Sequence, residues 1–410
     1  MIQEKVDRRP GPTRGANELL DVIETVHHIQ ELDELLERVL LEARSFVNAD
    51  AGTLYLVSRN RLFFSFVQND TLFARNQAES RYVYSSRSLP LDNSSLAGYV
   101  AASGESLLID DVYHIQSQVD YSFNPSFDQK TSYLTCSMLI VPLATRTGRI
   151  VGVLQLINAK ADDGTVVAFS EHDRRYVNQF ARHAAGAIEA ARLSKEMVLR
   201  MVELAELRDP FETSRHAKRV GAYAAELYHL WAIRNGTPEK TIRRKRGVLK
   251  TAAMLHDIGK VAVSDTILQK KGKLTAQERE RLRWHTVLGA RLFTYTNSPW
   301  DQMSREVILN HHERWDGSGY PGKIPSLSAH PIAFGPGKKG SEIPVSARIV
   351  AVVDVFDALV SERAYKDPWE VDRALEYLEA SAGGQFDPEL VTLFLGMQDV
   401  VASIRNKYEY

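Results

Sequence analysis

The chain has 410 residues, with 51 Lys and Arg against 52 Asp and Glu and a formal net charge of −1. That length predicts two domains, and the balanced charge excludes the global basic field of a protein that binds nucleic acid polymers or anionic membranes. The single cysteine, Cys136, excludes an internal disulfide framework. Because we find no apolar run of signal-peptide or membrane-span length, we expect a cytoplasmic protein with no membrane partner.

The N-terminal part is expected to form an α+β domain over residues 17–169, after an extended or disordered lead over residues 1–16. Apolar residues at helical spacing predict a helix that is broken near Glu31. Its expected buried stripe is Leu19, Ile23, Val26, Leu35, Val39 and Leu40. Short strands are expected over 52–58, 61–68, 104–111, 137–146 and 149–159, which predicts an antiparallel sheet. The polar and aromatic stretch 116–133 and nearby His114 indicate a solvated loop, with a ligand lid as the alternative.

A long connecting helix is predicted over residues 170–208. Its apolar residues alternate in steps of three and four: Val177, Phe180, Ala184, Ala187, Ala191, Val198, Met201 and Ala205. This seam suits a parallel coiled-coil homodimer, and its alanine-rich middle suits a close-packed intramolecular helix pair equally well.

The C-terminal part, residues 209–410, is expected to be an all-α bundle. Helices are predicted over 214–234, 240–259, 275–295, 300–313, 346–362, 368–380 and 387–406. No convincing series of strands follows Pro210.

Eight side chains with metal-binding atoms lie in or beside these helices: Glu212, His216, His256, Asp257, His285, His311, His312 and Asp354. Taken together they predict a metal site. Adjacent residues on a helix point about 100° apart, so His311 and His312 can serve two neighbouring metals, with a structural histidine pair as the alternative on this stretch alone. Imidazoles and carboxylates without a thiolate favour iron, manganese or zinc. Two such ions bridged by a carboxylate would predict hydrolysis of a phosphodiester.

The stretches "HDIGK" and "HHERWDGSGYPG" resemble the two signatures of the HD-GYP family, metal-dependent phosphodiesterases of the bacterial second messenger cyclic di-GMP. The resemblance covers about residues 206–394. It implies hydrolysis of cyclic di-GMP to pGpG, and onward to GMP, at two or three divalent ions, iron or alternatively manganese. A receptor or protein-interaction platform with weak activity, or a phosphodiesterase for another cyclic dinucleotide, remains as the alternative.

Carried over residue by residue, the resemblance implies that His216, His256, Asp257 and Asp354 are the ligands shared by HD hydrolases. His285, His311 and His312 complete the set, and Glu212 supplies a carboxylate for a third metal. It further implies catalytic roles for Asp257 and Lys260. The implied substrate contacts are Lys260, Gly319, Tyr320, Pro321, Arg363 and Lys366. The connection over residues 322–344 is longer than is usual in the family, and is either a lid or an inert excursion.

The N-terminal domain resembles a GAF domain, a common small-molecule sensor, over about residues 19–192. Asn158, Lys160, Phe169 and Asp173 partly match the motif of cyclic-nucleotide-binding GAF domains, with an inserted Ala159 and with Arg174 in place of an acidic residue. We expect these residues to serve the fold, and an unknown small molecule remains a candidate ligand.

Overall fold

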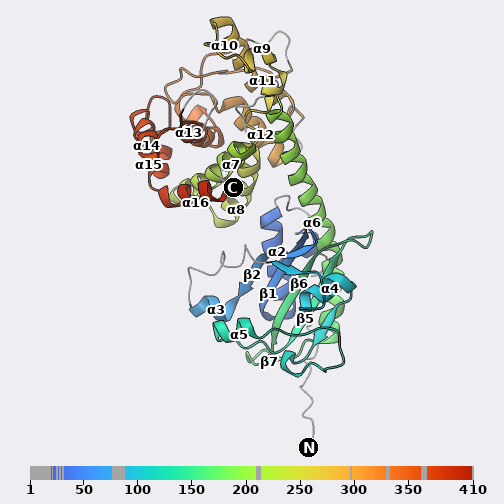
Figure 1. Cartoon of the computed structure of the whole chain (residues 1–410). Coiled ribbons are helices and arrows are strands. Elements are labelled where there is room, and N and C mark those ends of the chain that lie inside the picture. The colour runs from blue at the N-terminus through green and yellow to red at the C-terminus, as the bar shows by residue number, and fades with distance from the viewer. Residues whose placement is uncertain are drawn as a thin grey trace, which may run out of the picture. The chain divides into compact units, whose positions relative to one another are not determined.

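The computed structural model describes residues 32–75, 88–208, 214–295, 298–328, 333–361 and 367–408, with a few positions between 20 and 29. The chain divides into two compact units, residues 1–193 and 194–410. Both expected classes are confirmed, since an antiparallel sheet with helices is followed by a helical unit (Figure 1).

The N-terminal unit is built on one seven-stranded antiparallel sheet in the order β3-β2-β1-β6-β5-β4, with β7 paired to β6. The strands are β1 (Ala49–Ser58), β2 (Arg61–Asn69), β3 (Ser88–Pro90), β4 (Leu107–Ile109), β5 (Met138–Ala144), β6 (Ile150–Lys160) and β7 (Val166–Val167). The five expected strands are present, and the short β3 and β7 are additional. Three short helices, α3 (Asp70–Arg75), α4 (Leu96–Ser103) and α5 (Ser126–Thr131), and the 3-10 turn η1 (Val112–His114) lie between strands.

The strands bury both faces of the sheet. In β5, Leu139 and Val141 contribute to a core shared with α2 (Leu32–Val47) and α6 (Glu171–Glu206), whereas Met138 and Ile140 contribute to a second core with α4. The expected helical stripe is buried at every position that the structure describes: Ile23, Val26, Leu35, Val39 and Leu40. Ile29 is not helical and α2 begins at Leu32, which confirms the interruption. Leu19 and Glu31 lie outside the described residues.

The stretch after η1 is packed onto the second face rather than only solvated. Tyr121 and Phe123 lie against the second core, and Tyr121 contacts Tyr99 with 4.9 Å between ring centroids. The Asp128 carboxylate accepts hydrogen bonds from the Tyr113 hydroxyl at 2.9 Å and the Thr135 amide at 2.7 Å. This stretch is therefore part of the folded unit.

Four residues that resemble a nucleotide-binding motif are used by the fold. Asn158 has a positive φ of 56° and its side-chain oxygen accepts from the Cys136 amide at 2.7 Å. The Lys160 ammonium pairs with the buried Asp50, while Phe169 is fully buried. Asp173 accepts from the backbone N–H of Ser170 at 2.8 Å, at the start of α6.

Asp50 is 3% exposed and also accepts from the hydroxyl groups of Tyr133 at 2.7 Å and Thr71 at 2.8 Å. Burial alone raises the pKa of the Asp50 carboxyl, but the hydrogen bonds from Lys160, Tyr133 and Thr71 together hold it below its usual value. The motif-like residues thus join the ends of β1 and β6 and the start of α6.

Helix α6 is one continuous element of 36 residues, as expected for 170–208. The expected seam, however, is buried within the chain: Val177, Phe180, Ala184, Ala187 and Ala191 lie in the core with α2, and Val198 lies in a core of the C-terminal unit. The alternative of close intramolecular packing is therefore the one realised over 177–191. A different apolar strip, Leu193, Met197, Leu204 and Leu207, is exposed.

In the described residues of the C-terminal unit the regular secondary structure is helical, apart from an isolated bridge between Ala382 and Phe386. Its helices are α7 (Ser214–Arg234), α8 (Glu239–Ala253), α9 (Asp265–Leu268), α10 (Ala276–Arg283), α11 (His285–Arg291), α12 (Pro299–Asn310), α13 (Val345–Val360), α14 (Val371–Ala380), α15 (Pro388–Leu395) and α16 (Gln398–Tyr408). Two 3-10 turns, η2 (Ile258–Ala262) and η3 (Gly340–Glu342), join them. The main core lies between α7, α8, α13 and α15.

Three expected helices differ most from the observed ones. The helix expected over 240–259 stops at Ala253, and those expected over 275–295 and 387–406 are each two helices that meet near Trp284 and Gly396. The start of α12 follows local rules, since Ser298 caps it through the Asp301 amide and Pro299 occupies its first position.

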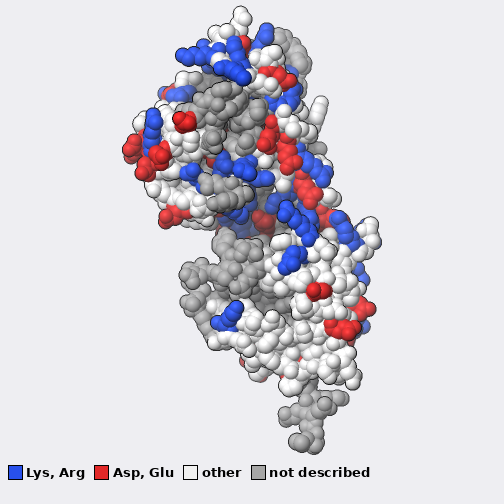
Figure 2. Space-filling model, viewed as in Figure 1, with Lys and Arg blue, Asp and Glu red and all other residues white. Residues whose placement is uncertain are grey.

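Side chains of both charge signs occur on the visible face of each unit (Figure 2). Among the described helices, none combines the length and apolar character that a bilayer crossing requires.

Candidate metal centre

Seven of the eight expected ligands converge in the C-terminal unit, and the eighth, Glu212, lies outside the described residues. They form two groups, Asp257, His285, His311 and His312, and His216, His256 and Asp354, within each of which the donor atoms lie within 4.8 Å of one another. Asp257 joins the groups, since its Oδ2 is 3.2 Å from His256 Nε2 and its Oδ1 is 3.0 Å from His285 Nε2.

The "HDIG" segment is shaped by a close backbone contact. After α8 ends at Ala253, the chain makes a turn that carries His256 and Asp257 into η2. A Cβ atom at Gly259 would lie 1.9 Å from the His285 carbonyl oxygen and 2.6 Å from the Gly289 nitrogen. Only glycine therefore allows η2 to approach α11 closely enough to place Asp257 beside His285.

His311 and His312 lie where α12 ends. His311 is the C-terminal cap of the helix and His312 lies in the turn after it. Their rings approach to 4.1 Å between centroids, and both belong to the group around Asp257. That they serve two neighbouring metals stays a prediction, and His312 lies beyond the end of α12 at Asn310.

Hydrogen bonds to backbone carbonyls orient three of the imidazoles. Nδ1 lies 2.9 Å from the Ala253 oxygen in His256, 2.8 Å from the Leu282 oxygen in His285 and 3.0 Å from the Ile308 oxygen in His311. We assign the proton to Nδ1 in each, because a carbonyl can only accept. The Nε2 lone pair of each ring is then available as a ligand.

These lone pairs face other acceptors. His285 Nε2 lies 3.5 Å from His311 Nε2, and His311 Nε2 lies 3.6 Å from Asp257 Oδ1. Burial lowers the pKa of His311, and lowers that of His312 further, so both favour the neutral form that binds metal. Acceptors that converge at such distances need a cation between them, and the residues present therefore fit a bound metal.

Asp257 and Asp354 supply the negative charge. Burial raises the pKa of the Asp257 carboxyl, but the charge of Lys260 and the neighbouring imidazole of His256 hold it well below its usual range. The pKa of the Asp354 carboxyl is likewise lowered, because the neighbouring imidazoles of His216 and His256 outweigh its burial. Both carboxyl groups therefore stay ionised.

A residue that the sequence analysis missed orients His216. Asp357 is fully buried, and its carboxylate accepts from His216 Nδ1 at 2.7 Å and from Arg219 Nε and Nη2 at 2.7 and 2.8 Å. Arg219 Nη2 also donates to Ser361 Oγ at 2.8 Å. The sequence spacing could have indicated this contact. Arg219 follows His216 by three residues and Asp357 follows Asp354 by three, so each pair lies on one helix face.

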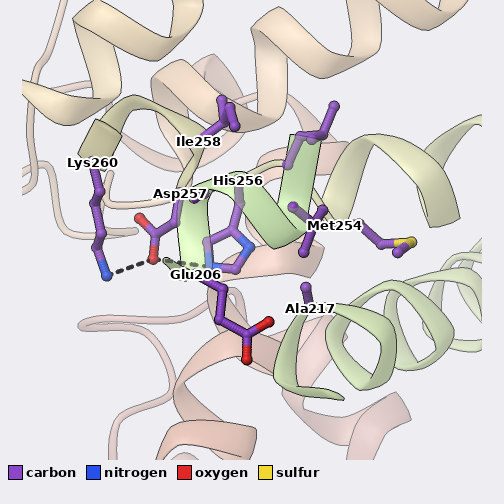
Figure 3. A pocket seen from close by; sticks show the side chains of 10 residues that line it. Glu206, Ala217, Met254, His256, Asp257, Ile258 and Lys260 are labelled. Atoms are coloured by element: carbon purple, nitrogen blue, oxygen red, sulfur yellow. Dashed lines mark ion pairs between the residues drawn. The ribbon is translucent and has the colours of Figure 1, made fainter. Parts of the chain in front are cut away.

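Lys260 lies in a pocket at the edge of the centre (Figure 3). Its Nζ is 2.9 Å from Asp257 Oδ2. Figure 3 shows His256 and Lys260 on either side of the Asp257 carboxylate, with Glu206 beside them. Glu206, the last residue of α6, also accepts from the Ser214 amide at 2.9 Å, which ties the end of α6 to the start of α7.

Arg208 makes hydrogen bonds to the residues that follow Lys260 in the chain. Its guanidinium donates to the carbonyl oxygens of Val261 and Val263, the latter at 3.3 Å, and to Asp265 Oδ1 at 2.8 Å. The segment that carries Lys260 is therefore tied to the residues that follow α6.

The expected substrate residues are only partly described. Gly319 approaches the backbone closely, since a Cβ there would lie 2.3 Å from the Arg314 nitrogen. Tyr320 stacks on His312 with 4.9 Å between ring centroids, and the bond from Tyr320 to Pro321 is cis. These three residues thus lie beside the centre, whereas Arg363 and Lys366 lie outside the described residues.

Comparison with known proteins agrees with this arrangement. Residues 200–390 match the HD domain family and residues 31–188 match the GAF domain family. The chain is 37% identical over 218 residues to 3'3'-cGAMP-specific phosphodiesterase 2 of Vibrio cholerae, which covers 53% of this chain and 37% of that protein. It is 40% identical over 201 residues to a cyclic di-GMP phosphodiesterase of Thermotoga maritima, covering 49% of this chain and 48% of that protein.

A third relative, the cyclic di-GMP phosphodiesterase response regulator RpfG of Xanthomonas campestris, is 38% identical over 214 residues, covering 52% of this chain and 50% of that protein. The chain thus spans half or less of the length of these relatives. The C-terminal unit therefore carries an HD domain and the N-terminal unit a GAF domain, and both signatures contribute residues to one centre, as the resemblance to the HD-GYP family implies.

Proposed function

We propose that this protein is a metal-dependent phosphodiesterase that opens cyclic di-GMP to linear pGpG, and onward to GMP, under the control of its GAF domain. The observation that carries the proposal is the pair of donor groups joined by Asp257. Three relatives that are 37–40% identical over 201–218 residues are named as phosphodiesterases of cyclic dinucleotides.

Seven side chains would hold the metal: His216, His256, Asp257, His285, His311, His312 and Asp354. A bound pair of divalent ions would supply an acidified water and would offset negative charge on the phosphoryl oxygens. Lys260 would add a cation at the pocket edge, where its ammonium can donate to a phosphate oxygen while Asp257 holds it in place. Asp357 keeps the His216 proton on Nδ1.

We propose iron as the metal, with manganese as the alternative, because imidazoles and carboxylates suit both and Cys136 lies in the other unit. A third ion would need a further carboxylate, for which Glu212 remains the candidate. Elemental analysis should give close to three metals per chain in the wild type and fewer in Glu212→Ala. An unchanged metal content would remove Glu212 from the site.

Activity is tested with purified protein loaded with Fe²⁺ or Mn²⁺. We expect it to consume cyclic di-GMP, and Asp257→Ala to abolish turnover. Asp163→Ala, in a solvent-exposed turn of the N-terminal unit, is the matched control and should act as the wild type does. Full metal occupancy in a wild-type protein that turns nothing over would favour the receptor or interaction-platform alternative.

A second substrate has a specific observation in its favour, because one relative is named a 3'3'-cGAMP-specific phosphodiesterase. Both cyclic dinucleotides present the same phosphodiester to the metals, so the choice depends on the base pockets. Comparing kcat/KM on the two substrates decides between them, and a higher value on 3'3'-cGAMP would replace cyclic di-GMP as the substrate.

We further propose that the protein is a homodimer that pairs along α6. The exposed strip Leu193, Met197, Leu204 and Leu207 has the spacing of a coiled-coil seam. A small molecule bound by the GAF domain could then bias both centres through this helix, within the limit of its differential affinity for the two states. Mass in solution tests the pairing.

A further inference from the structure

The connection after the Tyr320–Pro321 turn folds back onto that turn. The Gly335 amide donates to the Pro321 oxygen at 3.0 Å, and the Lys323 amide donates to the Pro336 oxygen at 2.9 Å. A Cβ at Gly337 would lie 2.1 Å from the Gly317 oxygen, so the two glycine-rich stretches are in backbone contact. The described part of the connection over residues 322–344 is therefore packed against the Tyr320–Pro321 turn, and we call it the wall. An inert excursion would not make these contacts.

A buried carboxylate anchors this wall to the metal centre. Glu313 directly follows His312 and is 3% exposed. It accepts hydrogen bonds from the backbone N–H of Gly322 and, at 3.1 Å, from that of Lys338. The Lys338 ammonium donates to the side-chain oxygen of Asn310. Glu313 thus holds two points of the connection, Gly322 and Lys338, next to His312.

The wall places one more aromatic ring beside the turn. The Phe334 ring lies 4.7 Å from Trp284 and 6.3 Å from Tyr320, measured between centroids, and is nearly parallel to Tyr320 with 16° between the ring planes. Tyr320 in turn stacks on His312, and the Arg283 guanidinium lies 5.0 Å from the Tyr320 ring centroid. We call His312, Tyr320, Phe334 and Trp284 the aromatic row.

The aromatic row starts in the metal centre and reaches partly exposed surface. His312 belongs to the group around Asp257, and Tyr320 is close enough to Asp257 and Lys260 for their charges to act on it. Trp284, Tyr320 and Phe334 are each half-buried, so part of each side chain faces solvent. Phe334 therefore does not serve only to fill a core.

We propose that the aromatic row, completed by Phe334, stacks a purine base of the cyclic dinucleotide, and that Phe334 determines how tightly that base is held. The inference rests on the proposed function. In a cyclic dinucleotide each base is one sugar away from a phosphodiester, so a phosphate at the metals brings a base to the adjoining surface. Stacking on aromatic faces suits any purine, and the Arg283 cation favours the electron-rich ring edge and carbonyl of guanine.

The test uses the full chain loaded with metal, and three substitutions of one residue. Phe334→Ala should raise KM for cyclic di-GMP about tenfold, since stacking of one base contributes about that factor, with kcat changed much less. Phe334→Leu keeps apolar volume without an aromatic face and should behave as Phe334→Ala does. Phe334→Trp keeps an aromatic face and should therefore have the wild-type KM. Tyr295→Ala, at a 90% exposed aromatic residue of the same unit, is the control and should change nothing.

A second readout is inhibition by the linear product. The inhibition constant for pGpG should rise with KM in Phe334→Ala and Phe334→Leu, and that for pUpU, whose smaller rings stack less, should rise less. A wild-type KM in Phe334→Leu would overturn the proposal, as would a fall in kcat alone. A wild-type protein that hydrolyses no cyclic dinucleotide would instead refute the proposed function, and the two failures are thereby distinguishable.

Discussion

Replacing Asp357 with asparagine tests whether a buried carboxylate sets the protonation state of a metal ligand. The substitution keeps the side-chain shape but puts an amide N–H₂ where His216 Nδ1 or Arg219 now donates. Two donors then face each other, and His216 relieves the conflict by moving its proton to Nε2, which lies 3.4 Å from Asp354 Oδ1. The lone pair that would bind metal is then lost.

Two magnitudes follow. Changing a residue that orients a ligand costs about 10- to 100-fold in metal affinity, which we expect for the ion held by His216. The buried Arg219 also loses its counter-charge, which costs about 3–5 kcal/mol of unfolding free energy. We expect about 3 kcal/mol, because Ser361 Oγ still accepts from Arg219. That lowers the unfolding midpoint of this unit by roughly 6–12 °C.

Metal content after dialysis against graded chelator measures the first effect. Unfolding of the metal-free protein measures the second, and tryptophan fluorescence reports on this unit alone because all five tryptophans lie in it. Asp387→Asn is the matched control, since it removes the carboxylate that pairs with Arg348, and neither residue belongs to a donor group. If Asp357→Asn loses stability as this control does but binds metal as the wild type does, Asp357 only stabilises the fold.

Three further outcomes are expected. The folded-state pKa of Asp50 is depressed, so its stabilising contribution is present above the unfolded value of 3.8 and is lost as the pH falls below it. The stability of the N-terminal unit, measured by urea unfolding followed by circular dichroism, should therefore fall more between pH 5 and 3 in the wild type than in Asp50→Asn. An equal loss of stability in the two proteins would contradict this. Arg208→Ala frees the turn that carries Lys260, so kcat should fall several-fold at unchanged metal content; unchanged kcat would show that the contacts only close the turn. Met197→Glu should halve the mass in light scattering whereas Glu203→Ala leaves it unchanged, and a dimer that persists in Met197→Glu excludes the exposed strip as its seam.

Which side chains form the two donor groups could be predicted from the sequence, because histidines and aspartates in the two signatures are typical of this chemistry. Asp357 could not be recognised in the same way, since an aspartate three residues after Asp354 on an apolar helix could equally be a solvent-exposed residue. Its role depends on α7 packing against α13, which brings Arg219 and His216 to it. Contacts between distant helices leave no local pattern.

Helix ends were the other weak point. Apolar spacing continues through Trp284 and Gly396, so pattern alone predicts one helix where two are present. The stop at Ala253 is set by the approach of Gly259 to α11, which is a tertiary contact. The predicted apolar seam of α6 is covered within the chain over 177–191 for the same reason. Periodicity shows that a helix face is apolar but does not show which neighbour covers it.

The way α6 is shared between the two units has a consequence for modular exchange. Val198 and Val202, near its C-terminal end, lie in one apolar cluster with Leu255, Ile258 and Phe293, around the turn that carries His256 and Asp257. A fragment that starts at residue 209 would strip these side chains of their cover, whereas one that starts at residue 194 keeps it. A natural or engineered fusion that joins this HD-domain unit to another sensor must therefore carry the last turns of α6 with it, so the transferable module begins inside the connecting helix.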